Sequence, residues 1–267
     1  MTGTPAPTSA IWDPHQYGRF EAERDRAALD LLLRVPSDLH PHVIWDLGCG
    51  PGHHAALLAR RHSTARVHGL DTSDAMLDQA RALGSAVDWV QGDISSWTPT
   101  VPADLIFANA SLQWLDRHEA LLPRLANALA PGGVLAVQMP LAHETRHHAL
   151  LRAVAGDGPW AAALAKADAR VPVLAPEAYY ALLAPGCDPV DIWSTTYLHA
   201  LAGPDAVLEW MKGTALRPYL TALADEPTLS EAFLTALGGR LAEAFPRRPD
   251  GVTLLPFPRL FLMARRR

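Results

Sequence analysis

The sequence predicts an α/β fold built on a doubly wound, mostly parallel sheet of seven strands. The first observation behind this prediction is the stretch 44–52 (IWDLGCGPG), where an apolar run meets an acid and glycines follow at alternate positions. The second is the alternation of short Val-, Ile- and Leu-rich runs with helical patterns, which is typical of βαβ units. These runs show little polar alternation, which indicates strands that are buried on both faces.

The elements follow this rhythm along the chain. Helical spacing of apolar residues predicts a first helix at about residues 15–33, which ends before Pro36. Strands are predicted at 43–47, 67–71, 87–91, 105–108 and 134–139, separated by helices that begin after Gly52, near residue 74 and near residue 119. Two later strands are predicted at 190–198 and 260–263.

The predicted domain organisation is simple. Residues 1–10 lack periodicity, and we expect a disordered leader there. No linker interrupts the rest, so residues 11–267 are predicted to form one domain, with helical lid segments at about 141–185 and 204–250. The three arginines at 265–267 are interpreted as a solvated tail.

Composition and charge exclude several classes of protein. The net charge of −5 gives no basic field for nucleic acid. Two isolated cysteines make neither a disulfide framework nor a zinc site, and no metal is predicted. The chain shows no secretory signal and no run of eighteen apolar residues. We therefore expect a soluble, cytoplasmic protein without membrane or nucleic-acid partners.

The glycine spacing separates the ligands that such a loop could serve. Glycines stand at 48, 50 and 52 and position 53 is His, so the third glycine of a dinucleotide fingerprint is missing. The P-loop pattern for phosphates is absent too. Asp71, about twenty residues after the loop, has the spacing of an acid that binds ribose. A nicotinamide-dependent oxidoreductase stays open as the less favoured alternative.

The pattern D-x-G-x-G-x-G at 46–52, with Asp71, Asp93 and 131–133 (PGG) in register, resembles class I S-adenosylmethionine-dependent methyltransferases. The resemblance implies a Rossmann-like fold and S-adenosylmethionine as cofactor, with S-adenosylhomocysteine as its product. It implies that the loop lies against the methionine part, that Asp71 holds the ribose hydroxyls and that Asp93 binds the adenine amino group. The cofactor-binding residues so implied are Asp46, Gly48, Gly50, Gly52, Asp71, Met76, Asp93, Ile94 and Asn109.

A second resemblance covers nearly the whole chain. The segments 12–24, 105–114, 134–140, 191–197, 216–218 and 257–261 are similar to trans-aconitate 2-methyltransferases. This similarity implies methyl transfer to one carboxylate of trans-aconitate, giving a monomethyl ester. Another small carboxylate, a natural-product acceptor and a non-catalytic cofactor-binding module remain the alternatives.

Methyl transfer to a carboxylate needs positioning more than acid–base catalysis. A carboxylate is already ionised at neutral pH, so no general base is required, and Asn109 and Tyr17 are predicted to position the reactants. Arginine can grip a carboxylate through two parallel hydrogen bonds, which makes Arg217 and Arg259 the leading substrate ligands. The other predicted substrate-binding residues are Tyr17, Gln113, Trp114 and Tyr219.

Overall fold

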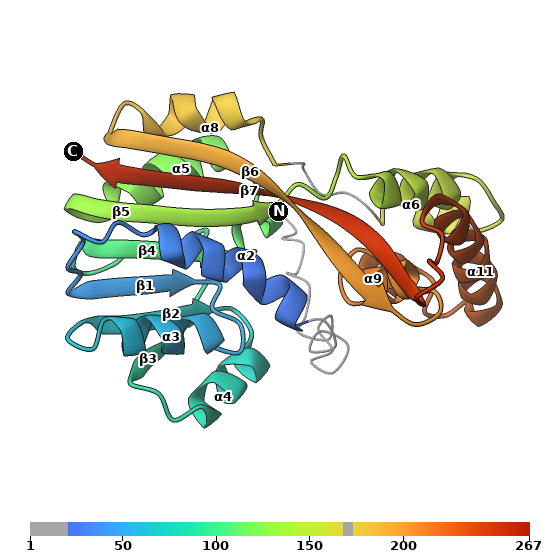
Figure 1. The fold of residues 1–267 in the computed structure, drawn as a ribbon, viewed down its shortest axis with the longest axis horizontal. Helices are drawn as coiled ribbons and strands as arrows, with labels where there is room; N and C mark the ends of the chain where they lie inside the picture. The colour runs from blue at the N-terminus through green and yellow to red at the C-terminus, as the bar shows by residue number, and fades with distance from the viewer. Residues whose placement is uncertain (1–20, 168–172) are drawn as a thin grey trace, which may run out of the picture. The chain divides into compact units, whose positions relative to one another are not determined.

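The computed structural model describes residues 21–167 and 173–267 (Figure 1). The chain divides into two compact units. The sheet unit contains residues 25–140, 173–195 and 259–267, and the helical unit contains 141–167 and 196–258 together with 21–24. The predicted leader at 1–10 lies outside the described residues.

The described residues form one sheet of seven strands in the order β3-β2-β1-β4-β5-β7-β6. The strands are β1 (Val43–Leu47), β2 (Arg66–Asp71), β3 (Val87–Gln91), β4 (Ala103–Asn109), β5 (Leu129–Pro140), β6 (Cys187–Ala202) and β7 (Val252–Arg266). The first five pair in parallel, while β7 runs antiparallel to β5. The predicted mostly parallel, doubly wound sheet is therefore confirmed.

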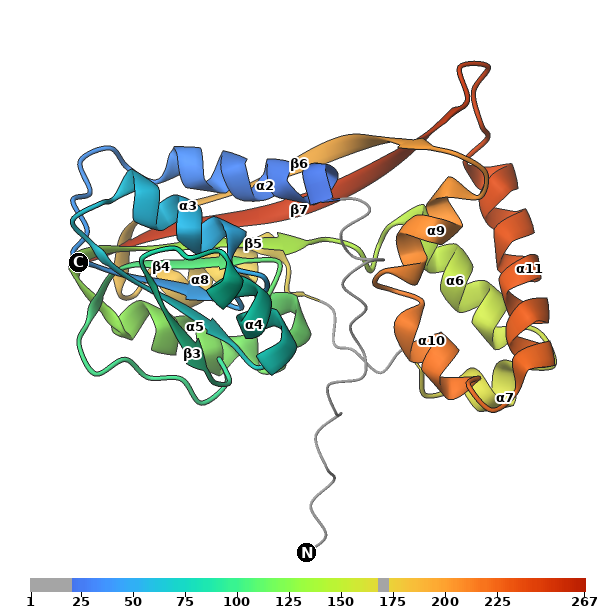
Figure 2. The ribbon, with the colours of Figure 1, turned by 90° about the horizontal axis from the view of Figure 1, so that it is seen from below.

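Helices cover both faces of the sheet unit. Figure 2 shows α2 (Glu21–Arg34) and α3 (His53–Arg61) on one face and α5 (His118–Asn127) on the other. Helix α4 (Asp74–Ala82) packs beside β2 and β3. The central strands β1, β4 and β5 are largely apolar and buried, with Ile44, Leu105, Phe107 and Leu135 at 0% exposure. Their burial on both faces explains why these three strands lack polar alternation.

Helix α8 (Pro176–Leu183) departs from the predicted lid at 141–185. It belongs to the sheet unit and packs against α5, where the buried Tyr179 hydroxyl lies 2.6 Å from Nδ1 of His118. His118 is fixed from its other ring nitrogen, Nε2, by the carbonyl oxygen of Leu112 at 2.9 Å. The lid prediction was wrong for this helix, because a buried hydrogen bond attaches it to the sheet layer.

The helical unit has its own hydrophobic core. The helices of this unit are α6 (Arg146–Gly156), α7 (Ala161–Leu164), α9 (Ala206–Lys212), α10 (Arg217–Ala222) and α11 (Pro227–Ala244). The ring of Phe233 packs edge-on to Trp160 at 5.5 Å and stacks with Tyr219 at 6.0 Å. The structure thus gives two compact units where the sequence predicted one domain with insertions. Within the described ranges, no helix has the length and apolar character needed to cross a membrane.

Candidate active site

The loop after β1 is built from three glycines with positive φ. Gly48, Gly50 and Gly52 have φ values of 78°, 52° and 86°, a region that residues with a Cβ rarely adopt. A Cβ at Gly48 would lie 2.3 Å from the Cβ of Ser111, whereas a Cβ at Gly50 would meet no atom of the described residues within 4 Å. Gly50 therefore borders open space that a ligand could fill, while Gly48 makes room for a neighbouring strand end.

Gly52 has a different neighbour. A Cβ there would lie 2.5 Å from the ring of Trp89 on β3, and a Cβ at Gly69 would lie 2.4 Å from the same ring. The indole of Trp89 thus packs against Gly52 of the loop and Gly69 of β2. At Gly48 and Gly52 the missing Cβ therefore accommodates the side chains of Ser111 and Trp89.

Strand β2 anchors the loop through its carboxyl end. The backbone N–H groups of Gly48 and Cys49 donate to the carbonyl oxygen of Leu70 at 2.7 and 3.0 Å. The N–H of Gly50 donates to Oδ2 of Asp71 at 2.9 Å, and the N–H of Ser73 donates to Oδ1 of the same carboxylate at 2.9 Å. Both oxygens are oriented by these bonds, so Asp71 presents its remaining lone pairs in a fixed direction.

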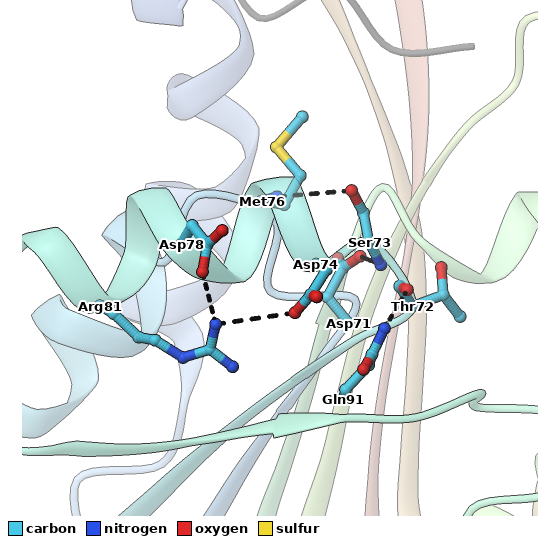
Figure 3. Close-up of polar contacts among 8 residues, drawn as sticks. All are labelled: Asp71, Thr72, Ser73, Asp74, Met76, Asp78, Arg81 and Gln91. Atoms are coloured by element: carbon cyan, nitrogen blue, oxygen red, sulfur yellow. Dashed lines mark hydrogen bonds and ion pairs between the residues drawn. The ribbon is translucent and has the colours of Figure 1, made fainter. Parts of the chain in front are cut away.

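Helix α4 begins directly after Asp71. Ser73 caps it, since its Oγ accepts from the N–H of Met76 at 3.4 Å (Figure 3). This cap fixes the first turn of α4, which contains the largely buried Met76, five residues after the acid at the end of β2. A buried apolar side chain of this kind can form part of the wall for a flat ring system.

The segment after β3 carries the second predicted acid. Asp93 is exposed, and its Oδ1 accepts from the N–H of Ser95 at 2.7 Å, which closes a local turn. Ile94 is buried, and its carbonyl oxygen accepts from Nη2 of Arg124 at 2.7 Å. The arginine fixes the backbone here and thereby the direction in which Asp93 projects.

Asp46, the acid before the glycines, is 2% exposed. Burial raises the pKa of its carboxyl group to about 7, with His54 acting in the opposite direction and Asp71 raising it further. Burial also raises the pKa of the Cys49 thiol, and both neighbouring acids add to this effect. A thiol that resists ionisation is a poor nucleophile, so covalent chemistry at Cys49 is disfavoured.

The end of β4 holds Asn109, which is predicted to position the reactants. Asn109 is half-buried, and its Oδ1 has no hydrogen-bond partner in the described part of the chain. Ala110 follows with a φ of 51°, which is uncommon for a residue with a Cβ. The hydroxyl of Ser111 then donates to the carbonyl oxygen of Leu47 at 2.6 Å and ties β4 to the glycine loop.

Gln113 and Trp114 lie in the short 3₁₀ turn after this point (Leu112–Trp114). Nε2 of Gln113 donates to the carbonyl oxygen of Ala110 at 2.7 Å, while its Oε1 is buried without a hydrogen-bond partner in the ranges described. A buried polar atom of this kind costs about 1–3 kcal/mol unless a ligand or water completes it. Trp114 is 42% exposed and projects a large apolar surface outward.

The predicted carboxylate ligands fall in different units. Arg259 belongs to the sheet unit, is 5% exposed and pairs in register with Pro140 at the carboxyl end of β5. Arg217 begins α10 in the helical unit, where Tyr219 is buried and stacks on Phe233. The burial of Tyr219 favours a packing role over a place in a substrate wall. Tyr17 lies outside the described residues.

Two residues of this site were missed in the sequence, namely Trp89 and Ser111. The partners of Trp89 are glycines on β2 and in the loop, and the partner of Ser111 is a carbonyl oxygen 64 residues away. Neither pairing leaves a local pattern. The available signal was a large aromatic residue in a short strand and a serine two residues after Asn109.

Together these groups fit a nucleoside with a flexible polar tail. Backbone and open space at Gly50 suit the tail, the oriented carboxylate of Asp71 suits ribose hydroxyls, and Met76 with Ile94 suits a base. Among the described residues, no group of three or more His, Cys, Asp or Glu side chains could hold a metal ion.

Comparison with known proteins places this arrangement in a class. Residues 44–133 match the family described as "Methyltransferase domain", and these residues contain the loop, Asp71, Asp93 and Asn109. Solved structures agree at the level of fold. The YcgJ protein from Bacillus subtilis has a TM-score of 0.58 at 13% identity, covering 91% of this chain and 99% of its own. Phosphoethanolamine N-methyltransferase 2 from Haemonchus contortus has a TM-score of 0.56 at 16% identity, and the match covers 94% of this chain and 56% of that protein.

Curated relatives define the family more closely. The trans-aconitate 2-methyltransferase of Methylobacterium nodulans is 52% identical over 259 residues, covering 96% of this chain and 99% of the relative. The trans-aconitate 2-methyltransferase of Azoarcus sp. is 49% identical, and the match covers 95% of this chain and 98% of the relative. The one from Yersinia pestis is 46% identical, and the match covers 95% of this chain and 97% of the relative. The chain belongs to the trans-aconitate 2-methyltransferase family.

Proposed function

We propose that the protein transfers the methyl group of S-adenosylmethionine to one carboxylate of trans-aconitate, giving a monomethyl ester and S-adenosylhomocysteine. The observation that carries the proposal is the fixed carboxylate of Asp71 beside the open space at Gly50, in a chain about half identical to this family over nearly its full length. A cytoplasmic location is part of the same proposal.

The cofactor supplies a methyl group activated on a sulfonium. Asp46, Gly48, Gly50 and Gly52 form the loop proposed to hold its methionine part, and Asp71 is proposed to accept hydrogen bonds from its ribose. Met76, Ile94 and Asp93 are proposed to surround the adenine. None of these residues has to accept or donate a proton during the reaction.

The acceptor carboxylate is ionised at neutral pH, since reference carboxyl pKa values lie near 4. The protein must therefore orient one oxygen in line with the bond that breaks and keep water out. Good orientation contributes roughly 7–11 kcal/mol to lowering such a barrier. We assign this positioning to Asn109 and Arg259 in the sheet unit. Tyr17, Gln113, Trp114, Arg217 and Tyr219 remain sequence-based predictions for substrate binding.

The direct test incubates purified protein with S-adenosylmethionine and trans-aconitate and follows S-adenosylhomocysteine and the methyl ester by mass spectrometry. We expect both products in equal amounts. Turnover with a different small acid but not with trans-aconitate would change the acceptor and keep the reaction class. Calorimetric binding of S-adenosylhomocysteine without turnover on any acceptor would instead indicate a cofactor-binding module.

A further inference from the structure

Strand β5 contains one polar side chain in an otherwise apolar, buried stretch. Gln138 is 0% exposed, as are its neighbours Val137 and Met139. Neither Oε1 nor Nε2 of Gln138 has a hydrogen-bond partner within the residues that the structure describes. A buried amide without partners opposes folding, and native proteins place such groups mainly where a ligand or water completes them.

The strand register shows what lies beside Gln138. It pairs with Asn109 of β4 and with Phe261 of β7, so these three side chains project from the same face of the sheet. Met139 projects from the opposite face, where its sulfur lies 3.9 Å from the hydroxyl oxygen of Tyr179. Gln138 therefore faces away from α8.

Other contacts identify the face that Gln138 shares. The ring of Phe261 stacks on Trp193 at 4.9 Å, and the guanidinium of Arg34, the last residue of α2, lies 4.5 Å from the centre of the Trp193 ring. The row Asn109–Gln138–Phe261 is thus on the α2 side of the sheet. Its two amides, Asn109 and Gln138, are side by side on neighbouring strands.

Arg259 completes the polar group. It pairs with Pro140, two residues beyond Gln138 on β5, so it projects from the same face. Diagonal neighbours of this kind are about 7–8 Å apart at Cα, within reach of long side chains. A buried guanidinium and a buried amide N–H at this separation are donors suited to carboxylate oxygens.

The position of Gln138 in the sheet also indicates that it would contact the acceptor and not the cofactor. Apart from Asn109, the groups that fit the cofactor follow β1, β2 and β3, whereas Gln138 lies near the end of β5, beside Asn109 at the end of β4. The strand order reverses between β1 and β4, which is where open α/β sheets bind ligands. The half beyond that point, at β4 and β5, is left for the second reactant.

We propose that Gln138 is a specificity-determining residue that donates its Nε2–H to a carboxylate of the acceptor, beside Arg259. The proposal rests on the proposed methyl transfer to a small polycarboxylate and adds a residue to that site. It explains why a glutamine occupies a strand position that leucine or methionine would fill without loss of hydrogen bonds.

The test uses the near-isosteric Gln138→Met variant in the full chain. We expect the acceptor KM to rise about tenfold or more, the usual effect of losing a hydrogen bond to a charged group. Calorimetric titration of trans-aconitate into protein saturated with S-adenosylhomocysteine should show the same loss of affinity. The affinity for S-adenosylhomocysteine alone should stay within about twofold, and the melting temperature should be equal or higher, because an unsatisfied buried amide has been removed.

The control is Val137→Ala, which removes buried volume from the opposite face of the same strand. It should lower the melting temperature and leave the acceptor KM unchanged. Gln138→Met with wild-type acceptor affinity would overturn the proposal. Should that variant not fold, Gln138→Glu decides, since a carboxylate there should repel the acceptor, and unchanged acceptor affinity would again overturn it. Absence of methyl transfer by the wild-type protein would instead refute the proposed function itself.

Discussion

The backbone N–H of Gly50 donates to Oδ2 of Asp71 over 2.9 Å, joining the glycine loop after β1 to the end of β2. The other carboxylate oxygen accepts from the N–H of Ser73, just before α4. One side chain thus fixes the loop and the helix start on either side of it. This double attachment gives Asp71 a structural role in addition to its proposed contact with ribose.

Asp71→Ala should therefore weaken cofactor binding strongly. Hydrogen bonds to a charged group contribute about 1.5–3 kcal/mol each, so we expect the Kd for S-adenosylhomocysteine to rise at least about tenfold. Asp74→Asn is the matched control, because Asp74 lies three residues on, is exposed and pairs only loosely with Arg81 at 3.7 Å (Figure 3). Equal affinities of the two variants by calorimetry would contradict this role.

The loop glycines should respond differently to alanine. At Gly48 an added Cβ meets the Cβ of Ser111 at 2.3 Å and also strains the backbone at φ 78°. We expect Gly48→Ala to lower the free energy of unfolding by about 2–3 kcal/mol or more. At Gly50 only the strain of positive φ remains, about 1–2 kcal/mol.

The two variants, Gly48→Ala and Gly50→Ala, are informative together because stability and cofactor affinity should be affected differently in them. Gly50→Ala places a methyl group in the space proposed for the cofactor, so its Kd for S-adenosylhomocysteine should rise although the protein stays the more stable of the two. Urea unfolding and calorimetry measure both quantities. A Gly50→Ala variant with normal cofactor affinity would place the cofactor elsewhere.

Arg259 gives a prediction for the acceptor. Arg259→Gln should raise the acceptor KM about tenfold or more and leave the Kd for S-adenosylhomocysteine nearly intact, because it removes a charge proposed to hold a carboxylate. On the sequence-based prediction alone, Arg217→Gln should likewise raise the acceptor KM. Arg248→Gln, at an exposed residue paired with Asp250, serves as the control for lost surface charge. Kinetics unchanged from wild type would remove Arg259 from the site, and the same result for Arg217 would remove it too.

The first four strands were predictable from sequence because each is a short segment that ends at an aspartate or asparagine, or one residue before a glycine. The predicted strand 43–47 matches β1, and 87–91 matches β3. Helix α8 was assigned wrongly, since its apolar residues do not show which layer they pack against. The bond between Tyr179 and His118 decides that, and it joins residues 61 positions apart.

The three terminal arginines show the same limit. They were predicted to be a solvated tail, yet β7 extends to Arg266. Arg265 donates to the carbonyl oxygen of Gly132 at 3.0 Å, and Arg267 donates to that of Pro185 at 3.0 Å. Gln138 belongs with these cases: the sequence shows a glutamine in an apolar run, but only the register with Asn109 shows a shared polar face.

His147 in the helical unit gives a prediction about pH. Its ring is 1% exposed, stacks on Phe257 at 5.7 Å and has Nε2 3.3 Å from Oγ1 of Thr145. Burial lowers the pKa of His147 from 6.5 to about 4. The unfolded chain therefore binds a proton between about pH 6.5 and 4 that the folded protein does not, so stability is present above pH 6.5 and declines as pH falls toward 4.

Replacing His147 by Phe should remove this dependence, because phenylalanine cannot be protonated and suits the aromatic contacts of the site. Buried Asp46, with its pKa raised to about 7, contributes in the opposite direction over this pH range in both proteins, so the comparison between them isolates His147. On going from pH 7.5 to pH 5, we expect the melting temperature of His147→Phe to change more favourably than that of wild type, by several degrees. His143→Gln, at an exposed histidine near the start of the same helix, should behave like wild type. If His147→Phe loses as much stability as wild type on acidification, the titrating group lies elsewhere in the molecule.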